Sequence, residues 1–172
     1  IWAYTRIDTV KPQYLDKLKA AGVNWLAIGI EAGNQEIRRE ITKGKFEDIN
    51  IREVTKMIQD AGINVCANYI FGLPGDTKET VKKTFDLSLE LCTAGWNTYG
   101  AMALPGSYLY KKALEEGNQL PDTYEGFSFH SYETLPLPTE KLSAKEIITL
   151  RDEAFNQYHT DLYLSLNYFL NF

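Results

Sequence analysis

Cysteine is scarce in this sequence. The chain has two cysteines, Cys66 and Cys92, which are too few for a disulfide framework and too far apart for a CxxC pair. Both lie among apolar residues. We therefore expect two buried free thiols, as in a protein of the reducing cytoplasm.

The sequence also lacks long apolar runs and an excess of basic residues. No run approaches the roughly 18 apolar residues that a membrane-spanning helix needs, and no signal peptide opens the chain. The 18 Lys and Arg are outnumbered by 23 Asp and Glu, for a net charge of −5, which argues against a nucleic-acid-binding surface. These absences favour a cytoplasmic protein with a small-molecule substrate, and with neither nucleic acid nor a membrane as its partner.

The first residues, from Ile1 to Tyr4, already have the pattern of a strand, and no initiator methionine precedes them. A natural domain rarely begins inside a buried strand. We expect the chain to be a piece of a longer protein, although its 172 residues are enough to bury a core of their own.

An internal repeat organises the first part of the chain. The pattern Ala-Gly-x-Asn occurs at residues 21–24, 61–64 and 94–97. Each copy follows a helical pattern, so each glycine is expected to end a helix in the left-handed conformation that glycine adopts easily. Each copy also precedes a short, continuous apolar run, which is typical of a strand buried on both faces of a parallel sheet. The predicted strands lie near residues 1–6, 24–30, 64–71 and 98–104.

The segments between these strands have apolar residues at helical spacing. Strands that alternate with helices of this length predict right-handed crossovers and a parallel sheet, and the period of the repeat fits the units of a β/α barrel. Four strands are too few to close a barrel, so we expect an α/β fold that is half of a TIM-like β/α barrel. The predicted helices lie at residues 11–21, 51–61, 78–92 and 107–116.

The pattern changes in the C-terminal part of the chain. Residues 118–140 contain three prolines and several aromatic residues without a clear period, as in a loop that packs on another part of the protein. Ser143 and Glu146 have the capping-box spacing of a last helix, which is expected to reach about Tyr163. We therefore divide the chain into the half-barrel, residues 1–117, and a C-terminal loop and helical extension, residues 118–172.

Polar residues and glycines gather at the carboxyl ends of the predicted strands. In parallel β/α folds, ligands bind at these ends. The charges there are mixed, with Arg6, Asp8, Glu31 and Lys43 nearby, so a zwitterionic ligand fits better than a polyanion. The four segments are residues 5–8, 29–33, 72–77 and 104–107.

The same segments carry a resemblance to a known family. They read TRID at residues 5–8, GIEAGNQEI at 29–37 with Lys43 beyond it, NYIFGLPGDT at 68–77 and ALPGSYLY at 103–110. Each motif alone is common, but the four in this order are specific. The succession resembles the latter part of a radical S-adenosyl-L-methionine (SAM) domain, most closely the branch with the cobalamin-dependent enzymes and the anaerobic magnesium-protoporphyrin cyclases.

The resemblance implies a role in SAM binding for several polar residues. Glu31 matches a position whose side chain hydrogen-bonds the ribose of SAM, and Asn68 matches a second ribose-binding position on the next strand. Lys43 matches a basic position that meets the methionine carboxylate. Arg6 would be a further polar residue of the same rim.

The resemblance also implies contacts to the adenine. Ile70 and Gly72 match two positions of the family's Gly-x-Ile-x-Gly-x-x-Glu motif, in which the backbone and an aliphatic side chain hold the adenine. Asn68 and Gly75 replace the first Gly and the Glu of that motif, so only half of it is present. Met102 matches a position at which the family often closes the adenine pocket with backbone contacts.

The chain departs from the family in having no CxxxCxxC motif. In the family that motif precedes these strands and supplies the three thiolates that hold a [4Fe-4S] cluster while one iron stays open to SAM. For the intact parent, the resemblance implies reductive cleavage of SAM to a 5′-deoxyadenosyl radical. Methyl transfer or ring formation are the candidate reactions, with cobalamin as a candidate second cofactor. The fragment alone is expected to bind no metal and to be inactive.

Two other functions remain open on the sequence. One is a non-radical β/α-barrel enzyme in which Glu31 and Asp8 act as a carboxylate pair in acid–base catalysis. The other is a non-catalytic binding module, which the missing cluster motif permits.

Structural roles are open for the charged residues as well. Glu31 could cap the next helix or pair with Arg38, and Lys43 with Gly44 could form an ordinary helix stop. A half-barrel also leaves the outer edges of its first and last strands unpaired. We therefore expect the fragment to dimerise or to cover an edge with residues 118–140.

Overall fold

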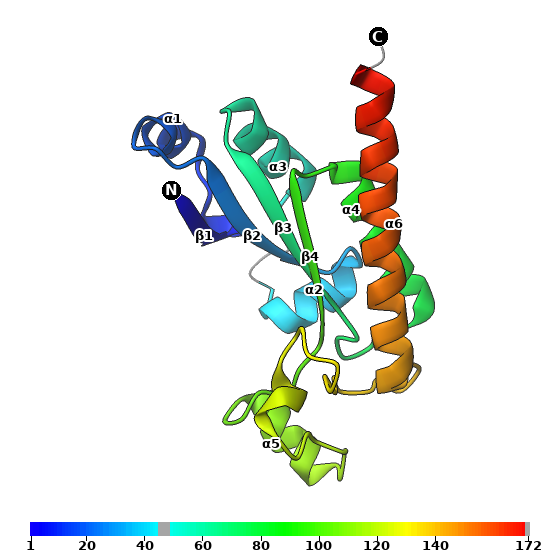
Figure 1. Ribbon diagram of the computed structural model, residues 1–172. Coiled ribbons are helices and arrows are strands. Elements are labelled where there is room, and N and C mark those ends of the chain that lie inside the picture. The colour runs from blue at the N-terminus through cyan, green and yellow to red at the C-terminus, as the bar shows by residue number, and fades with distance from the viewer. Residues whose placement is uncertain (45–48, 171–172) are drawn as a thin grey trace.

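The computed structural model describes residues 1–44 and 49–170, with side chains as far as residue 160. Within these residues, four parallel strands form one sheet in the order β1-β2-β3-β4 (Figure 1). The predicted parallel α/β sheet is confirmed, and the first three strands lie within one residue of their predicted bounds. The strands are β1 (Trp2–Arg6), β2 (Trp25–Glu31), β3 (Asn64–Phe71) and β4 (Gly95–Gly100).

The described part of the chain also forms six α-helices and two short 3-10 helices. Five α-helices begin after a residue whose side chain accepts a hydrogen bond from the first turn, which satisfies backbone donors that a helix start leaves free; one of them is Ser143, before α6. The other four capping residues are Asn34, Asn50, Thr77 and Ser107. The α-helices are α1 (Pro12–Ala20), α2 (Gln35–Thr42), α3 (Ile51–Asp60), α4 (Lys78–Leu91), α5 (Tyr108–Glu115) and α6 (Ala144–Leu170), and the 3-10 helices are η1 (Ile7–Thr9) and η2 (Tyr124–Phe127).

The fourth strand begins and ends earlier than the sequence predicts. Helix α4 ends with Cys92 in the left-handed conformation (φ 44°), and Gly95 already belongs to β4. The third Ala-Gly-x-Asn copy therefore does not end a helix, unlike the first two, in which Gly22 and Gly62 have φ of 88° and 73°. At Gly95 the missing side chain makes room for Cys66, whose Sγ would lie 3.0 Å from an added Cβ.

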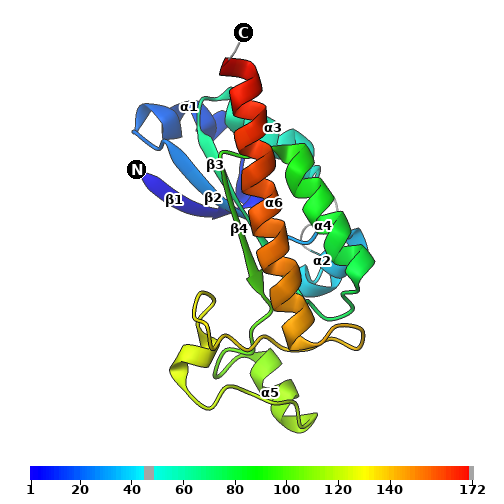
Figure 2. The ribbon, with the colours of Figure 1, turned by 45° about the vertical axis from the view of Figure 1, so that its right-hand side comes forward.

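One hydrophobic core fills the space between the sheet and helices α1, α3, α4 and α6, which cover the same face of the sheet (Figure 2). An aromatic contact in this core joins Trp96 of β4 to Tyr158 of α6, whose rings stack with centroids 5.0 Å apart. The Tyr158 hydroxyl donates a hydrogen bond to the carbonyl of Thr93 over 2.8 Å. Full burial of a large apolar side chain contributes about 1.5–3 kcal/mol, so these contacts anchor α6 to the sheet.

The last helix is longer than predicted. It runs to Leu170 rather than to about Tyr163, and Ser143 and Glu146 form the expected capping box at its start. No helix in the described residues is long and apolar enough to cross a membrane.

Helices α2 and α5 lie at the carboxyl end of the strands rather than over the main core (Figure 1). A second, smaller apolar cluster forms there, in which Ile37 of α2 packs with Leu73 and Ala101 from the loops after β3 and β4. This cluster closes the end of the sheet at which we expect the ligand.

Residues 118–140 pack against the end of β4, as expected for a loop with this composition. The ring of Phe129 lies 5.0 Å from that of Tyr99, and the N–H of Leu137 donates to the carbonyl of Ala101 over 2.9 Å. The opposite edge of the sheet is β1, which pairs only with β2 among the described residues. The loop therefore does not cover the β1 edge, and dimerisation through that edge stays a prediction.

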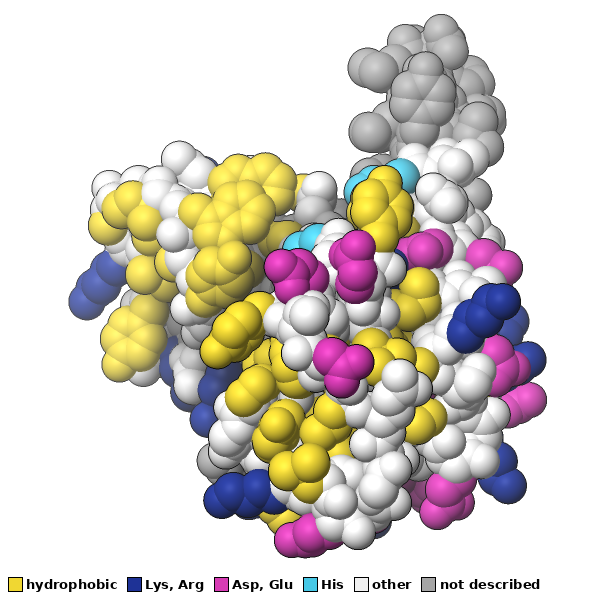
Figure 3. All heavy atoms as spheres, turned by 60° about the horizontal axis from the view of Figure 1, so that its bottom comes forward, with side chains coloured by type: hydrophobic (Ala, Val, Ile, Leu, Met, Phe, Trp, Pro, Cys, Tyr) yellow, Lys and Arg dark blue, Asp and Glu magenta, His cyan; other side chains and the backbone are white. Residues whose placement is uncertain are grey.

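Several aromatic side chains are exposed on the sheet and loops. Trp2 is 49% exposed and stacks on Trp25 with centroids 4.9 Å apart, and Tyr4 is 80% exposed. Seen from the end that carries α5, hydrophobic side chains form a large part of the surface, with acidic residues between them (Figure 3).

Candidate functional site

The register of the sheet brings four residues from four strands into one row. Arg6 is the partner of Gly29, Gly29 of Asn68, and Asn68 of Asn97. Partners in parallel strands project to the same face of a sheet. The row therefore brings polar groups together close to the carboxyl ends of the strands, where β/α folds bind their ligands.

Glu31, the last residue of β2, has an unusual backbone. Its φ is 68°, and the register between β2 and β3 shifts at this point. As a result its carboxylate folds back over Gly29, where an added Cβ would overlap Oε1 of Glu31. A left-handed conformation at a residue with a side chain is strained and is common at functional sites.

The carboxylate of Glu31 is unsatisfied within the described residues. Neither of its oxygens accepts a side-chain or backbone hydrogen bond there, and partial burial raises the pKa of Glu31 above its usual range. A carboxylate that is partly withdrawn from water without a donor is costly. Hydroxyl groups of a bound ligand would supply the missing donors.

Asn68 and Asn97 form a pair of amides beside this carboxylate. The Asn97 Nδ2 donates to Oδ1 of Asn68 over 3.2 Å, and the Asn68 Nδ2 donates to the carbonyls of Ile28 and Cys66, each over 3.2 Å. The amide of Asn68 is thus held in one orientation. Asn97 is a site residue that the sequence reasoning missed, because the fourth strand was placed three residues too late.

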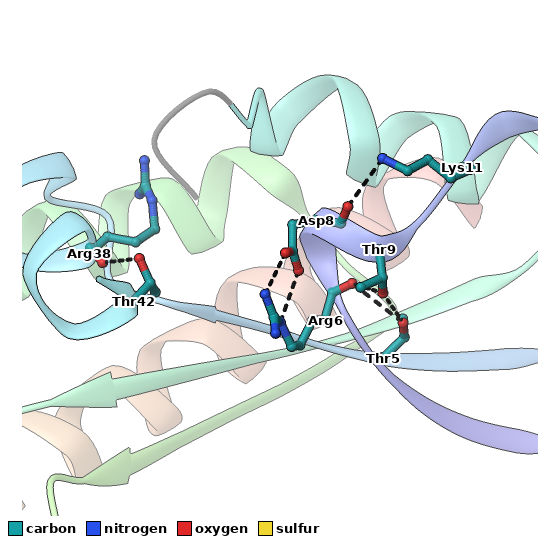
Figure 4. Close-up of polar contacts among 7 residues, drawn as sticks. All are labelled: Thr5, Arg6, Asp8, Thr9, Lys11, Arg38 and Thr42. Carbon is teal, nitrogen blue, oxygen red and sulfur yellow. Dashed lines mark hydrogen bonds and ion pairs between the residues drawn. The ribbon is translucent and has the colours of Figure 1, made fainter. Parts of the chain in front are cut away.

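Arg6 forms an ion pair with Asp8 at the end of β1 (Figure 4). Its Nε lies 3.0 Å from Oδ1 of Asp8 and its Nη2 lies 2.5 Å from Oδ2. Asp8 is therefore engaged by a guanidinium, and no contact between Asp8 and Glu31 exists in the described structure. This geometry gives no support to the carboxylate pair that the sequence left open.

Lys43 ends helix α2 in the left-handed conformation, with φ of 52°, and Gly44 follows it with φ of 76°. The helix-stop interpretation of this pair is confirmed. The side chain of Lys43 is exposed and makes no hydrogen bond or ion pair within the described residues. Its contact with a ligand carboxylate stays a prediction.

The two structural roles considered for Glu31 are both wrong. Asn34 caps α2, since its Oδ1 accepts from the N–H groups of Glu36 and Ile37 over 2.9 and 3.1 Å. Arg38 donates from Nη1 to the carbonyl of Ala32 over 2.7 Å instead of pairing with Glu31.

The apolar residues of the predicted site differ in their positions. Ile70 is half-buried and packs on the small cluster beneath α2. Met102 is buried and lies five positions beyond Asn97, so it is further along the rim than the polar row. Both lie at the carboxyl end of the sheet, as predicted.

Gly72 is required by the packing of the turn after β3. Its φ is 79°, and a Cβ there would lie 2.5 Å from Cδ1 of Ile147 in α6. The buried carboxylate of Asp76 accepts from the N–H groups of Gly72 and Leu73 over 3.0 and 2.9 Å. The N–H of Gly72 is therefore committed to the turn, and any ligand contact would use its carbonyl.

A pocket of about 170 Å³ opens beside this turn. Gly72 and Ala101 line it from the strand ends, and α5 and residues 137–140 close its other sides. The carboxyl end of the sheet thus combines a row of polar residues with a pocket of mixed polar and apolar lining.

The cysteines do not form a metal centre. Cys66 is buried as predicted, whereas Cys92 is exposed at the end of α4, which corrects the expectation of two buried thiols. The described residues contain no group of three or more His, Cys, Asp or Glu side chains placed to hold a metal ion.

Known proteins resemble this chain over part of its length. A protein of Methanocaldococcus jannaschii that carries the name of a methylthiotransferase is 27% identical over 85 residues, which are 49% of this chain and 19% of the relative. The radical SAM methyltransferase TsrM of Kitasatospora setae, solved with cobalamin and a [4Fe-4S] cluster, has a TM-score of 0.59 at 23% identity, over 70% of this chain and 24% of its own.

A third likeness covers nearly the whole chain. Coproporphyrinogen III oxidase of Escherichia coli, a radical SAM enzyme, has a TM-score of 0.61 at 17% identity, over 92% of this chain and 32% of its own. This chain therefore spans between about a fifth and a third of the lengths of these proteins. The model of the Radical SAM superfamily matches residues 3–88, which is half of the chain, and the chain belongs to that superfamily.

Proposed function

We propose that this chain is the SAM-binding half of a radical SAM enzyme. The observation that carries the proposal is the carboxylate of Glu31, which is folded over Gly29 next to the fixed amide of Asn68 and finds no donor within the described residues. The two hydroxyl groups of a ribose would provide such donors. When SAM is bound and reduced in the intact enzyme, it supplies the radical that abstracts hydrogen from the substrate.

The residues present fit SAM but do not fit the iron–sulfur cluster. The carboxylate of Glu31, the amides of Asn68 and Asn97 and the exposed Lys43 match the hydroxyl groups of a ribose and the carboxylate of a methionine. Two cysteines on separate elements cannot provide the three thiolates of a four-iron cluster. We propose that the cluster ligands lie in another part of the parent protein and that this chain alone does no radical chemistry.

Each residue of the proposed site would bind a particular part of SAM. Glu31 and Asn68 would orient the ribose, and Lys43 would hold the methionine carboxylate by a charge-assisted contact. Ile70, Gly72 and Met102 would bound the adenine, and Arg6, held by Asp8, would keep the adjacent rim polar. We propose residues 1–117 as the barrel half and residues 118–172 as an extension that closes the end of β4.

Methyl transfer is the reaction class that we favour for the parent, with cobalamin as its second cofactor. The sequence resemblance supports this choice, as does the fold shared with TsrM, which was solved with cobalamin. Ring formation is the second candidate. Cobalamin is a candidate cofactor for both reactions, so the product that the intact parent forms, a methylated or a cyclised substrate, separates the two.

SAM affinity tests the proposed site. In the intact parent, Glu31→Ala should lose hydrogen bonds from the ribose to a charged acceptor, which would weaken SAM binding by roughly ten- to a hundredfold. Lys43→Ala should have a smaller effect, because its side chain is exposed to solvent. Calorimetry on the reconstituted protein measures both.

Matched controls on the helices make this experiment specific. Glu40→Ala and Lys17→Ala remove the same charges from exposed positions on α2 and α1 and should leave SAM affinity unchanged. Iron content should be the same in all four variants. Unchanged SAM affinity in Glu31→Ala and Lys43→Ala would show that these residues do not bind SAM and have only a structural role at the ends of β2 and α2.

A further inference from the structure

A second pocket, of about 420 Å³, lies among helices α2, α3 and α4. Its volume falls in the range of roughly 300–1,000 Å³ that is usual for small-molecule sites. None of the proposed SAM-binding residues lines it. The pocket is therefore separate from the rim described above.

The charged residues that line this pocket are incompletely paired. Glu90 accepts two hydrogen bonds from Arg52, over 2.5 and 2.6 Å, and Asp86 pairs with Lys82 over 2.7 Å. Both carboxylates of the pocket are thus neutralised by other cations. Arg38 and Lys83 remain without a carboxylate partner in the part of the chain that the structure describes.

Of the two cations without a carboxylate partner, Lys83 is exposed, whereas Arg38 is buried and only 8% exposed. Its guanidinium extends away from α2 (Figure 4), and its hydrogen bond from Nη1 to the carbonyl of Ala32 uses one of five N–H donors. Burial, and next the neighbouring charge of Arg52, lower the pKa of Arg38. A buried cation that faces a second cation is costly unless an anion joins it.

The start of α3 adds to the positive potential of the pocket. Ile49, Asn50 and Ile51 line it, and the side chain of Asn50 accepts from the N–H of Glu53 over 3.2 Å. This leaves N–H groups at the start of the helix directed toward its amino-terminal end, where anions bind favourably. A guanidinium, an ammonium group and a helix start therefore border one cavity.

We propose that this pocket binds the phosphate group of a small molecule. A phosphate monoester carries nearly two negative charges at neutral pH, which balances the two cations that lack a partner. The planar guanidinium of Arg38 suits two oxygens of a phosphate, and Lys83 contributes a point charge at the entrance. The volume beyond the phosphate holds the group esterified to it.

The probes are inorganic phosphate and adenosine monophosphate, titrated into the full-length protein at constant ionic strength against chloride. Binding is measured by calorimetry, and the shift of the melting temperature gives a second readout. Tighter binding of the nucleotide identifies an ester site, and tighter binding of inorganic phosphate identifies a site for the free ion. Binding of neither probe overturns the proposal.

Two variants and one control locate the binding. Arg38→Met keeps the packing of the aliphatic stem and should weaken phosphate binding by roughly ten- to a hundredfold. Lys83→Gln, at an exposed position that is not needed for folding, should weaken it by about two- to fivefold. Lys17→Gln, on α1, should have no effect.

Stability without ligand separates this proposal from a structural role of Arg38. If the guanidinium of Arg38 binds an anion, the melting temperature of Arg38→Met in phosphate-free buffer should be no lower than that of the parent. Added phosphate should then raise the melting temperature of the parent only. If Arg38 serves only to hold Ala32, the variant should melt lower with and without phosphate. That result, together with unchanged binding in Lys83→Gln, would overturn the proposal.

Discussion

At the end of β2, the carboxylate of Glu31 is held over Gly29 by a left-handed backbone and a shift in strand register. Two unfavourable features meet in this residue, the strained φ of 68° and the partial burial of a carboxylate that accepts no hydrogen bond from the described residues. A fold keeps such a residue when a ligand offsets the cost. The same carboxylate should therefore weaken the ligand-free protein and strengthen the complex.

The ionisation of Glu31 should destabilise the native state as the pH rises, and Glu31→Gln should remove this effect. Burial raises the pKa of Glu31, so the native state holds this proton more tightly than the unfolded chain does. Its stabilising contribution is complete at low pH and is lost as the pH rises through the raised native pKa. The variant should gain stability over the parent as the pH rises above about 4, the usual pKa of a glutamate in the unfolded chain.

Denaturant unfolding of the SAM-free protein at several pH values measures this difference. Burial also raises the pKa of Asp76, but Asp76 is present in both proteins, so its contribution cancels. A variant that is less stable than the parent by the same amount at every pH would show that Glu31 has a structural partner in solution.

At the residue scale, the sequence predicted which strand ends carry polar groups but not how they meet. Arg6, Glu31 and Asn68 all lie near the carboxyl ends of their strands as expected. The fold-back of Glu31 depends on a local register shift, and the contact of Asn97 depends on where β4 begins. Neither follows from local patterns, because pairing between distant strands sets both.

Among the elements, the turn between β3 and α4 both packs against α6 and forms part of the carboxyl end of the sheet. Asp76 holds the backbone of Gly72 and Leu73, and Thr80 donates to the Oδ1 of Asp76 over 2.6 Å. Thr139 donates to the carbonyl of Asp76 over 2.9 Å and so ties the C-terminal segment to the same turn. The turn is thereby fixed from both sides.

Gly72→Ala should destabilise the protein by about 2–5 kcal/mol. The left-handed conformation costs a residue with a Cβ about 1–2 kcal/mol, and the overlap with Ile147 adds about 1–3 kcal/mol. Gly75→Ala is a matched control in the same turn, with φ of 85° and open space around its Cβ, and should cost only the first amount. Denaturant unfolding gives both values.

A double variant isolates the packing contribution. In the background of Ile147→Ala, which removes the atoms that meet the new Cβ, Gly72→Ala should cost about 1–2 kcal/mol. Equal costs for Gly72→Ala and Gly75→Ala in the parent would contradict the close approach of α6 to this turn.

Helices α1, α3, α4 and α5 and the first three strands could be predicted because their signals are local. Apolar spacing and the glycines at positions 22 and 62 act within a few residues. The start of β4 was predicted too late because Gly95 has the sequence pattern of a helix end. In the structure Gly95 instead makes room for Cys66 on the neighbouring strand. Such a contact is visible only once the sheet is assembled.

For the molecule as a whole, an open sheet of four parallel strands has helices over one face and exposed aromatic residues on β1. The C-terminal extension covers the end of β4, and β1 remains an edge strand in the described structure. Unpaired edges attract further strands. The geometry is that of half of the eight-stranded barrel that β/α enzymes close around their ligands.

The position of the ribose in a crystal structure of the intact protein with SAM bound tests the central claim most directly. The distance to measure is the one between the carboxylate oxygens of Glu31 and the ribose hydroxyl groups. Our account predicts a hydrogen bond of about 2.5–3.0 Å, with the amide of Asn68 beside it. A ribose placed beyond about 3.5 Å from Glu31, with its hydroxyls bound by other residues, would contradict the assignment of this rim as the SAM site.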